Sequence, residues 1–311
     1  MKLLALCISV CLAISAVAQP VQKIKQLLKD RKFERLNSYI INHPQNNDLE
    51  FDWHVLRDIV GSYQEGVISM EEYIRSTDSE RDSHANYYTI NLLTVNGKIF
   101  YYSFIKEHYK KNMAGEWKLH AQIIDTLKNS IAYAAFKSLF RQTYGDTLND
   151  SDLFQPGIVY GSLCGMALKP TTYQDKLDSL LSNKNVSGIR KWLTSASAEK
   201  QLYAIRGYKV LVNQGYSLSA DEKRVIAVVR QKQGTVAACG GCTYFTKDFQ
   251  VIVTEMDSTP VEYLMPLPAQ PSQIPFQSNR PAKKSSPLFG WLVAAVFGAY
   301  LFFILQAIKK N

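Results

Sequence analysis

The sequence predicts an α+β fold in which helices accompany a three-stranded antiparallel meander, followed by a small helical-hairpin region and one transmembrane helix. Three observations support this class. Two segments rich in aromatic and β-branched residues are separated only by Asn96-Gly97, which suits a tight hairpin turn. Apolar residues recur at helical spacing before and after this hairpin. An uncharged apolar run, residues 288–308, is long enough to cross a bilayer.

The chain opens with the features of a cleaved secretory signal. Lys2 precedes an apolar run, residues 3–18, that ends in the small-x-small triplet Ala16-Val17-Ala18. We therefore expect the mature protein to begin at Gln19 and to fold outside the cytoplasm. An uncleaved N-terminal anchor is the alternative.

The first part of the mature chain is predicted to be helical as far as Pro44, because apolar residues from Val21 to Ile40 recur every three or four positions. A second amphipathic helix is expected over Trp53–Tyr63. The three strands of the meander are expected over Tyr87–Val95, Lys98–Ile105 and Trp117–Ile124.

The hairpin turn at Asn96-Gly97 also predicts a register. Pairing across it sets Leu92 opposite Tyr101 and Leu93 opposite Phe100, on opposite faces of the sheet. Both faces are thus partly apolar, and we expect both to be covered.

The chain after the meander is predicted to be mainly helical. Capping-box spacing at Thr172–Asp175 and Ser219–Glu222 marks two helix starts. The succession resembles a short HEAT-like stack, with a plain small bundle as the alternative. A strand-like segment follows at Gln250–Glu255. The remaining helices are expected over Ile131–Phe140, Ile158–Leu168, Val186–Leu193, Leu202–Val212 and Glu222–Gln231.

Seven of the eleven prolines lie between residues 260 and 287, so this stretch is expected to be an extended stalk. The signal peptide places the N-terminus outside, which leaves only a short tail in the cytoplasm. The predicted organisation is a signal peptide (1–18), an α+β extracytoplasmic domain (19–168), a helical region with Cys-x-x-Cys (169–258), a stalk (259–286), a transmembrane helix (287–308) and a tail (309–311).

Gly290, Ala294 and Gly298 recur at every fourth position of the predicted transmembrane helix. They share one helix face and would let a second helix approach closely, which makes a homodimer through the membrane a candidate arrangement. The alternative is that small residues are simply common in membrane helices.

Cys239-Gly-Gly-Cys242 is the one short motif with a chemical mechanism behind it. Two intervening residues bring the thiols close enough to form a disulfide. We expect a structural disulfide, as suits an exported domain. A redox-active pair and a metal site are the alternatives, the latter lacking further ligands of suitable spacing. Cys164 lies in an apolar run and is expected to be a buried thiol.

Other short patterns lead to no catalytic or cofactor site. The sequence contains no G-x-S-x-G, Walker loop, dinucleotide fingerprint or H-E-x-x-H. Residues 78–82 alternate like the first ligands of a calcium loop, but Ser83 and Thr89 replace the required glycine and glutamate. The paired aromatics Tyr87-Tyr88 and Tyr101-Tyr102 favour sheet packing over a sugar-binding face. We expect no cofactor and no metal.

The charge distribution and the expected location outside the cytoplasm limit the classes of partner that the protein could bind. Residues 19–286 hold all 27 acidic and 33 of the 36 basic side chains, a dispersed excess of +6, and we do not expect nucleic acid as a partner. We expect a single-pass, membrane-anchored interaction or accessory module outside the cytoplasm. Its partner would be an unidentified protein or envelope component, and no enzymatic activity is expected. The alternative is an extracytoplasmic thiol–disulfide protein that uses Cys239 and Cys242; an enzyme with a site assembled only by folding is a third.

Overall fold

The computed structural model describes residues 20–43, 49–74, 84–111, 116–155, 157–166 and 168–264. The predicted signal peptide and transmembrane helix lie outside these residues, as do Gly290, Ala294 and Gly298. Within the described ranges, no helix is long and apolar enough to cross a bilayer. The expected mixture of helices with an antiparallel sheet is confirmed.

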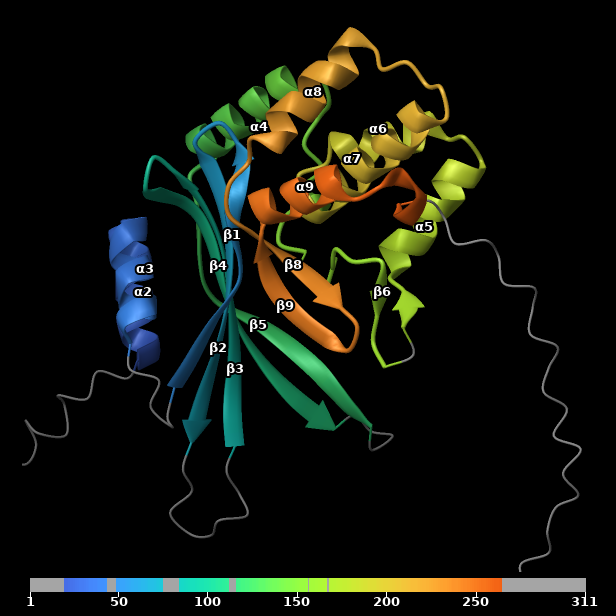
Figure 1. Ribbon diagram of the computed structural model, residues 1–311. Helices are drawn as coiled ribbons and strands as arrows, with labels where there is room; N and C mark the ends of the chain where they lie inside the picture. The colour runs from blue at the N-terminus through green and yellow to red at the C-terminus, as the bar shows by residue number, and fades with distance from the viewer. Residues whose placement is uncertain are drawn as a thin grey trace, which may run out of the picture. The chain divides into compact units, whose positions relative to one another are not determined.

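The sheet is a five-stranded antiparallel meander whose strands pair in sequence order (Figure 1). The three predicted strands form its last three members, and two strands precede them. The five are β1 (Leu49–Val60), β2 (Tyr63–Ile74), β3 (His84–Val95), β4 (Lys98–Lys111) and β5 (Trp117–Lys128).

The helix predicted over Trp53–Tyr63 is wrong, because this segment is most of β1 and the start of β2. Val55, Arg57 and Ile59 are all buried, which is the alternation of a strand. A buried arginine among them hides that alternation, so the apolar residues alone are spaced as on one face of a helix. Gly61, with φ of +54°, forms the turn into β2.

The hairpin at Asn96-Gly97 is confirmed, and both residues have positive φ, as a type I′ turn requires. The predicted register is wrong by one residue. Leu92 lies opposite Tyr102 and Leu93 opposite Tyr101, because the ladder shifts between Leu93 and Thr94. Such an irregularity adds a residue to one strand and leaves no signal in a hydrophobic pattern.

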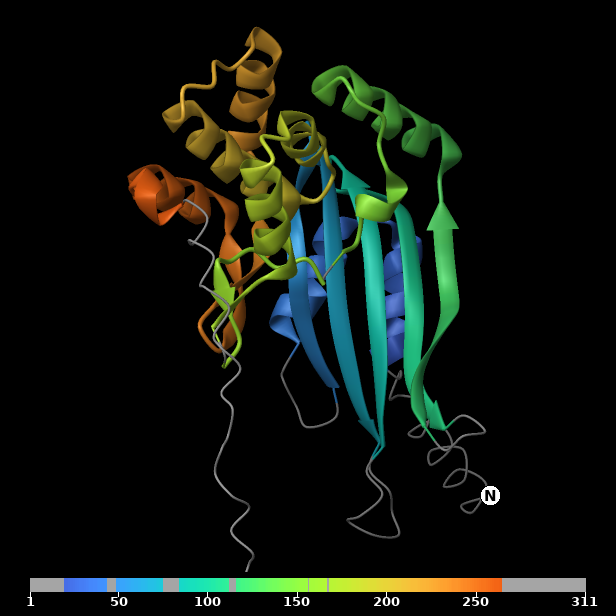
Figure 2. The same cartoon turned by 90° about the vertical axis from the view of Figure 1, so that its right-hand side faces the viewer.

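Helices α2 (Pro20–Asp30) and α3 (Phe33–Asn42) cover one face of the sheet (Figures 1 and 2). Their apolar sides join alternate sheet residues, including Ile90 and Phe104, in one hydrophobic core. The predicted helical run over Val21–Ile40 is thus confirmed, although Arg31 at φ +56° divides it into two helices.

A second core lies at one end of the sheet. Helix α4 (Ser130–Tyr144) contributes Phe136 and Phe140, and these pack with Leu93 and Phe100 of the sheet. Both faces of the sheet are therefore covered at this end, as predicted.

The same core continues into the helical region that follows (Figure 1). The box at Ser219–Glu222 is confirmed, whereas the cap of α5 is Thr171, one residue earlier than predicted. The helical region consists of α5 (Thr172–Ser182), α6 (Val186–Leu193), α7 (Ala198–Asn213), α8 (Ala220–Arg230) and α9 (Phe249–Ser258), with a hairpin of β8 (Thr235–Gly240) and β9 (Thr243–Asp248) before α9.

Two predicted elements are wrong in this region. Ile158–Leu168 is not helical and contributes β6 (Leu163–Cys164), which pairs with β7 (Lys169–Pro170). Gln250–Glu255 belongs to α9 and is not a strand. Its helix start is fixed by Asp248, whose carboxylate accepts hydrogen bonds from the first free N–H groups of α9.

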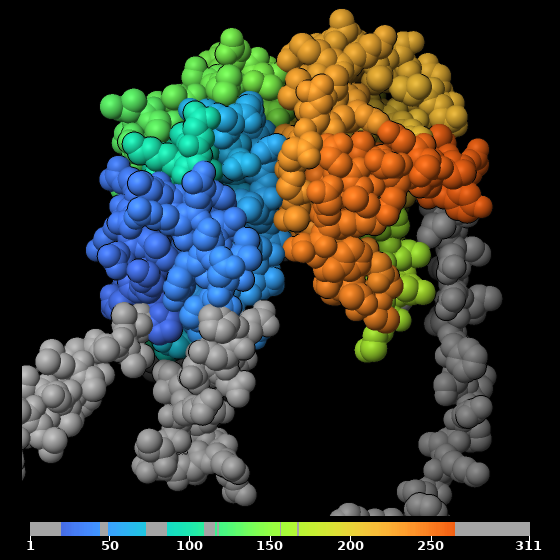
Figure 3. Space-filling view, turned by 60° about the vertical axis from the view of Figure 1, so that its left-hand side comes forward, coloured from blue at the N-terminus to red at the C-terminus, as the bar shows by residue number. Residues whose placement is uncertain are grey.

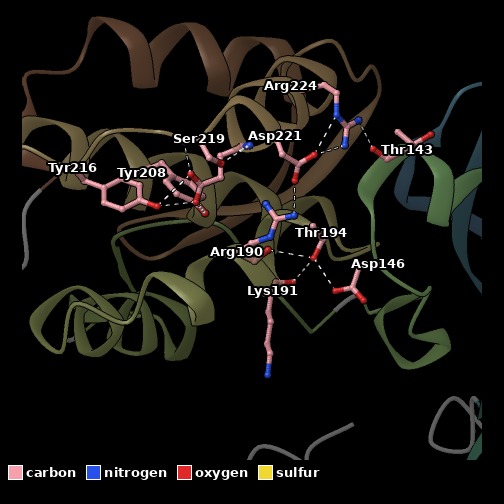
Figure 4. Close-up of polar contacts among 11 residues, drawn as sticks. Thr143, Asp146, Arg190, Lys191, Thr194, Tyr208, Tyr216, Ser219, Asp221 and Arg224 are labelled. Atoms are coloured by element: carbon pink, nitrogen blue, oxygen red, sulfur yellow. Dashed lines mark hydrogen bonds and ion pairs between the residues drawn. The ribbon is translucent and has the colours of Figure 1, made fainter.

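Side-chain contacts connect the outer helices. Arg224 of α8 donates to the carbonyl of Thr143 in α4, at 2.6 Å, and to Asp221, at 2.7 Å. Asp221 also pairs with Arg190 of α6, at 2.6 Å (Figure 4). These partly exposed pairs fix the orientation of the helices more than they add stability.

Candidate functional site

The predicted Cys239–Cys242 disulfide is not formed. Cys239 is instead joined to Cys164, with 5.9 Å between their Cα atoms, and Cys242 is an exposed free thiol. The buried-thiol prediction for Cys164 is therefore also wrong, although this residue is buried. The sulfur partner came from a segment 75 residues earlier in the chain, which spacing alone does not reveal.

The backbone explains this pairing. Cys239-Gly-Gly-Cys242 forms the tip of the β8–β9 hairpin, where Gly240 pairs with Thr243. Along the free edge of β8, Tyr160 exchanges hydrogen bonds with Ala237 and Cys239. This parallel contact places the chain around Cys164 beside Cys239.

Gly161 lets the two segments approach this closely. A Cβ atom at this position would lie 2.5 Å from the carbonyl oxygen of Cys239 and 2.6 Å from its Sγ. It would also lie 3.2 Å from the Sγ of Cys164. Only glycine leaves room for the disulfide here.

An open cavity of about 450 Å³ adjoins the disulfide. Cys164, Lys169 and Thr171 line it, together with the rings of Tyr173 and Tyr244. It offers a cation, hydroxyl groups and aromatic surface next to a sulfur atom, but no acid–base pair that would indicate hydrolysis.

A second surface lies on the face of the sheet opposite α2 and α3. Near one end of the strands no described helix stands in front of this face (Figure 2). We call this part the open half. Two rows of opposed residues form it: Glu50, Glu71, Tyr87, Glu107 and Ala121, and then Asp52, Ser69, Thr89, Ile105 and Ile123.

The open half combines acidic and apolar side chains. Glu50 lies directly opposite Glu71, and no described Lys or Arg forms an ion pair with either. Glu107 accepts a hydrogen bond from Thr89 at 3.1 Å. Ile123 is 62% exposed. A shallow cavity of about 330 Å³ lies over the acidic part.

The paired tyrosines divide between the two faces. Tyr88 and Tyr102 are buried under α2 and α3, in agreement with the packing interpretation. Tyr101 stacks on Phe154, with ring centroids 5.5 Å apart. Tyr87 alone remains 40% exposed, in the open half.

At the other end of the same face, buried charges join the sheet to the helical region. We call Arg57 and Glu65, with the groups that cover them, the closed half. Arg57 pairs with Glu65 of β2 at 3.1 Å and with Glu199 of α7. Glu199 also accepts from the backbone N–H of Ala237 at 3.1 Å. All three charged side chains are at most 1% exposed.

Lys232 completes the closed half. Its Nζ donates to Gln201 at 2.7 Å, and it is 5% exposed. Burial, reinforced by the positive charge of Arg57, lowers the pKa of Lys232 to about 7. Burial raises the pKa of Glu65, against the opposing effect of Arg57. Because Arg57 forms buried ion pairs with the sheet and with α7, the closed half has a structural role and connects the sheet to the helical region.

Backbone contacts support that connection. Gly234, at φ +102°, pairs with Arg57 of β1, and a Cβ at this position would lie 2.2 Å from the carbonyl oxygen of Leu56. The start of β8 is thereby attached to the edge of the sheet. Beyond this attachment the hairpin and the sheet diverge, leaving a notch on the surface (Figure 3).

A third cavity, of about 350 Å³, is polar but internally satisfied. Asp152 accepts from Ser195 at 2.6 Å and from Lys200 at 2.7 Å. The serine thus faces a carboxylate that Lys200 already neutralises, with no histidine beside it. This arrangement stabilises the loop before the helices and gives no activated nucleophile.

The structure bears on metal binding only within the described residues, and it does not describe the predicted membrane helix. In the part of the chain that the structure describes, no three His, Cys, Asp or Glu side chains are placed to hold a metal ion. The acidic stretch 78–82 and the predicted membrane-packing residues Gly290, Ala294 and Gly298 lie outside that part.

Comparison of the chain with protein-family models, with characterised proteins and with solved structures finds no match. The open half is not predicted from the sequence either, because no element is expected at Glu50 and Asp52 and the continuation of β1 from Trp53 is expected to be a helix. Alternation of acidic residues at Glu50 and Asp52 was the one signal that could have indicated it.

Proposed function

We propose that the protein is a membrane-tethered binding module whose open half takes a basic polypeptide segment with apolar side chains. The observation that carries this proposal is the opposed pair Glu50 and Glu71, with which no Lys or Arg of the described residues forms an ion pair, on a sheet face that also exposes Ile123. Elsewhere on the same face, Glu65 is held in a buried ion pair with Arg57.

The acidic residues of the open half favour a partner that carries Lys or Arg side chains. Like charges directly opposite each other on neighbouring strands are destabilising, and Asp52 adds a third acidic group nearby. A Lys or Arg side chain placed between them would offset this repulsion. Ion pairs at such an exposed surface are screened by salt, so binding should weaken as ionic strength rises.

Shape and apolar surface favour a polypeptide over a small cation. The open half extends over five strands, and the rings and branched side chains of Tyr87 and Ile123 stand beside the acidic rows. Apolar contact supplies affinity that charge in water does not.

The tether completes the proposal. The proline-rich stalk (259–286) and the apolar run (287–308) would hold the folded part outside the membrane and near other envelope components. A helix–helix contact through Gly290, Ala294 and Gly298 would double the number of binding surfaces, which raises avidity for a repeated partner.

The test uses the full-length chain in non-ionic detergent and two fluorescent synthetic peptides, one alternating Lys with Val and one alternating Glu with Val. We expect the Lys peptide to bind more tightly, and Glu71→Lys to weaken it about tenfold. Glu262→Lys, an exposed acidic position in the segment after α9, is the matched control and should retain binding.

Equal binding of both peptides, or equal loss in Glu71→Lys and Glu262→Lys, would contradict the proposal. Cross-linking in native membranes then identifies the natural partner by its dependence on Glu71.

A further inference from the structure

Three cysteines converge on one hairpin turn. Cys239 and Cys242 flank Gly240-Gly241, and Cys164 forms a parallel bridge with Gly241. The N–H of Gly165 donates to the carbonyl of Gly241 at 2.8 Å. Chain segments far apart in sequence therefore place a third sulfur beside a Cys-x-x-Cys motif.

The three sulfurs differ in accessibility. The disulfide partners Cys164 and Cys239 are 9% and 7% exposed, whereas Cys242 is an exposed free thiol. A disulfide and a free thiol in the same turn are the two reactants of thiol–disulfide exchange. No external oxidant or reductant is needed for them to react.

We infer that Cys164, Cys239 and Cys242 form a thiol–disulfide exchange site in which the bond moves from a covered to an exposed position. The thiolate of Cys242 attacks Sγ of Cys239. A Cys239–Cys242 bond forms, the Cys164–Cys239 bond breaks, and Cys164 leaves as a thiolate that takes up the proton lost by Cys242. Sulfur oxidation states balance, because one disulfide and one thiol are present before and after.

The turn has the freedom that this step requires. Two glycines separate Cys239 from Cys242, and Gly241 already has φ of +57°. A Cβ at Gly240 would meet only the ring of Phe245, at 3.8 Å, and at Gly241 nothing within 4 Å. The tip can therefore change conformation without disturbing a packed core.

The leaving sulfur stays close. The hydrogen bonds of Tyr160 to β8 hold the segment before Cys164 in place, at 2.8 and 3.0 Å. Exchange is thus reversible, and the resting position is favoured by the burial of the Cys164–Cys239 bond.

The exchanged form has the chemistry of a disulfide donor to a thiol-bearing polypeptide. The Cys239–Cys242 bond would face solvent at the hairpin tip, where a partner thiolate can attack one sulfur, form a mixed disulfide and release the other as a thiolate. Cys164 would become a thiol lining the cavity of about 450 Å³, beside Lys169. This inference stands apart from the open half and does not rest on the proposed binding function.

The test is alkylation of the native full-length chain with N-ethylmaleimide at pH 8, followed by an acid quench and mass-spectrometric mapping of disulfide peptides. We expect Cys242 to be labelled first. Alkylation of Cys242 blocks exchange in that molecule, so label on Cys164, together with a Cys239–Cys242 disulfide peptide, should appear in a second fraction of molecules, which small successive portions of reagent trap in the exchanged form.

The matched control is Cys242→Ser, in which no attacking thiol remains. We expect the labelling of Cys164 to be at least about tenfold slower than in the unmodified chain. Cys164→Ser provides a second measurement, since Cys239 and Cys242 are then both thiols and should form a disulfide with each other when oxidised glutathione is supplied as the oxidant.

Two results would overturn the inference. One is labelling confined to Cys242, with the Cys164–Cys239 peptide intact, even when the unlabelled chain is held for hours at pH 8 before each small portion of reagent. The other is equal labelling of Cys164 in the unmodified chain and in Cys242→Ser, which would indicate incomplete oxidation and not exchange.

Discussion

The two halves of one sheet face carry the same kinds of residue in opposite settings. In the closed half, Glu65 is fully buried and paired with Arg57. In the open half, Glu71 lies six residues further along the same strand and on the same face, opposite Glu50, and it forms no ion pair with a Lys or Arg in the described part of the chain. Strand β2 therefore passes from a covered, charge-matched environment to an uncovered, charge-repelling one.

The difference shows which acidic residues the fold itself requires. A buried carboxylate without a partner would cost several kcal/mol, so Glu65 needs Arg57, and Arg57 in turn needs Glu199. A partly exposed carboxylate costs less when unpaired than a buried one, so Glu71 can serve an external partner. Substitutions in the two halves should accordingly differ in size and, in one case, in sign.

The largest effect is expected for Arg57→Met, which leaves Glu65 and Glu199 buried without the guanidinium that forms an ion pair with both. We expect a loss of about 3–5 kcal/mol in the free energy of unfolding, measured by urea denaturation. Lys137→Met is the control, because its ion pair with Asp150 is about half exposed and should contribute no more than about 1 kcal/mol. A similar small loss of stability in Arg57→Met and Lys137→Met would show that the closed half does not join the sheet to the helical region.

Gly234→Ala should have the next largest effect, since the added Cβ meets the carbonyl oxygen of Leu56 where β8 attaches to the sheet. We expect a loss of about 2–3 kcal/mol from overlap and positive φ together. Gly145→Ala is the control that measures the cost of positive φ without steric overlap. Gly145 also has positive φ, at +73°, but nothing lies within 4 Å of its Cβ position, so about 1 kcal/mol is expected. Equal losses of stability in Gly234→Ala and Gly145→Ala would mean that the backbone around Leu56 moves to accommodate the added Cβ.

The third prediction concerns pH. The folded pKa of Lys232 is lowered to about 7 from 10.5, so between these values the unfolded chain binds one more proton. Stability contributed by this group therefore rises with pH over that window, by up to about 1.4 kcal/mol per pH unit, and is lost as pH falls toward 7. Arg57, Asp58, Glu65 and Glu199 supply the surrounding charges.

Lys232→Met should remove this rise, as judged by melting temperatures between pH 7 and 10. The ring of Tyr144, 5.5 Å from Nζ, gives the methionine an apolar neighbour, so the variant should fold. An unchanged pH profile would show that Lys232 is neutral or solvated in the folded chain.

The smallest effect has the opposite sign. Glu71→Lys places a cation opposite Glu50, so we expect stability to rise by about 0.5 kcal/mol, measured by urea denaturation. This gain separates loss of peptide binding from loss of folding in the same variant. A fall in stability would show that Glu71 already has a favourable role within the fold.

Features determined by neighbouring residues were predictable from the sequence. Asn96-Gly97 and the box at Ser219–Glu222 act within a few positions, and the structure contains both. Features determined by distant contacts were not. Arg57 can be buried in β1 only because Glu199 arrives from α7, and Cys239 meets Cys164 only because the segment around Tyr160 runs along β8.

In the candidate sites too, what depends on neighbouring residues was predictable and what depends on distant contacts was not. The Cys-x-x-Cys motif indicates thiol chemistry, but its spacing predicts a Cys239–Cys242 disulfide and carries no information about Cys164. The open half required knowing that Glu50 begins a strand. The membrane helix with Gly290, Ala294 and Gly298 remains a prediction.

The Cys164–Cys239 bond also has a mechanical consequence. It closes a covalent ring around helices α5 to α8, so tension applied between the sheet and residue 264 passes through the sulfur atoms and bypasses those helices. A chain pulled by its C-terminal end would extend only outside the ring. Moving the bond to Cys239–Cys242 would open the ring and let the pulling force reach the helices, which would lengthen the molecule at the first unfolding event.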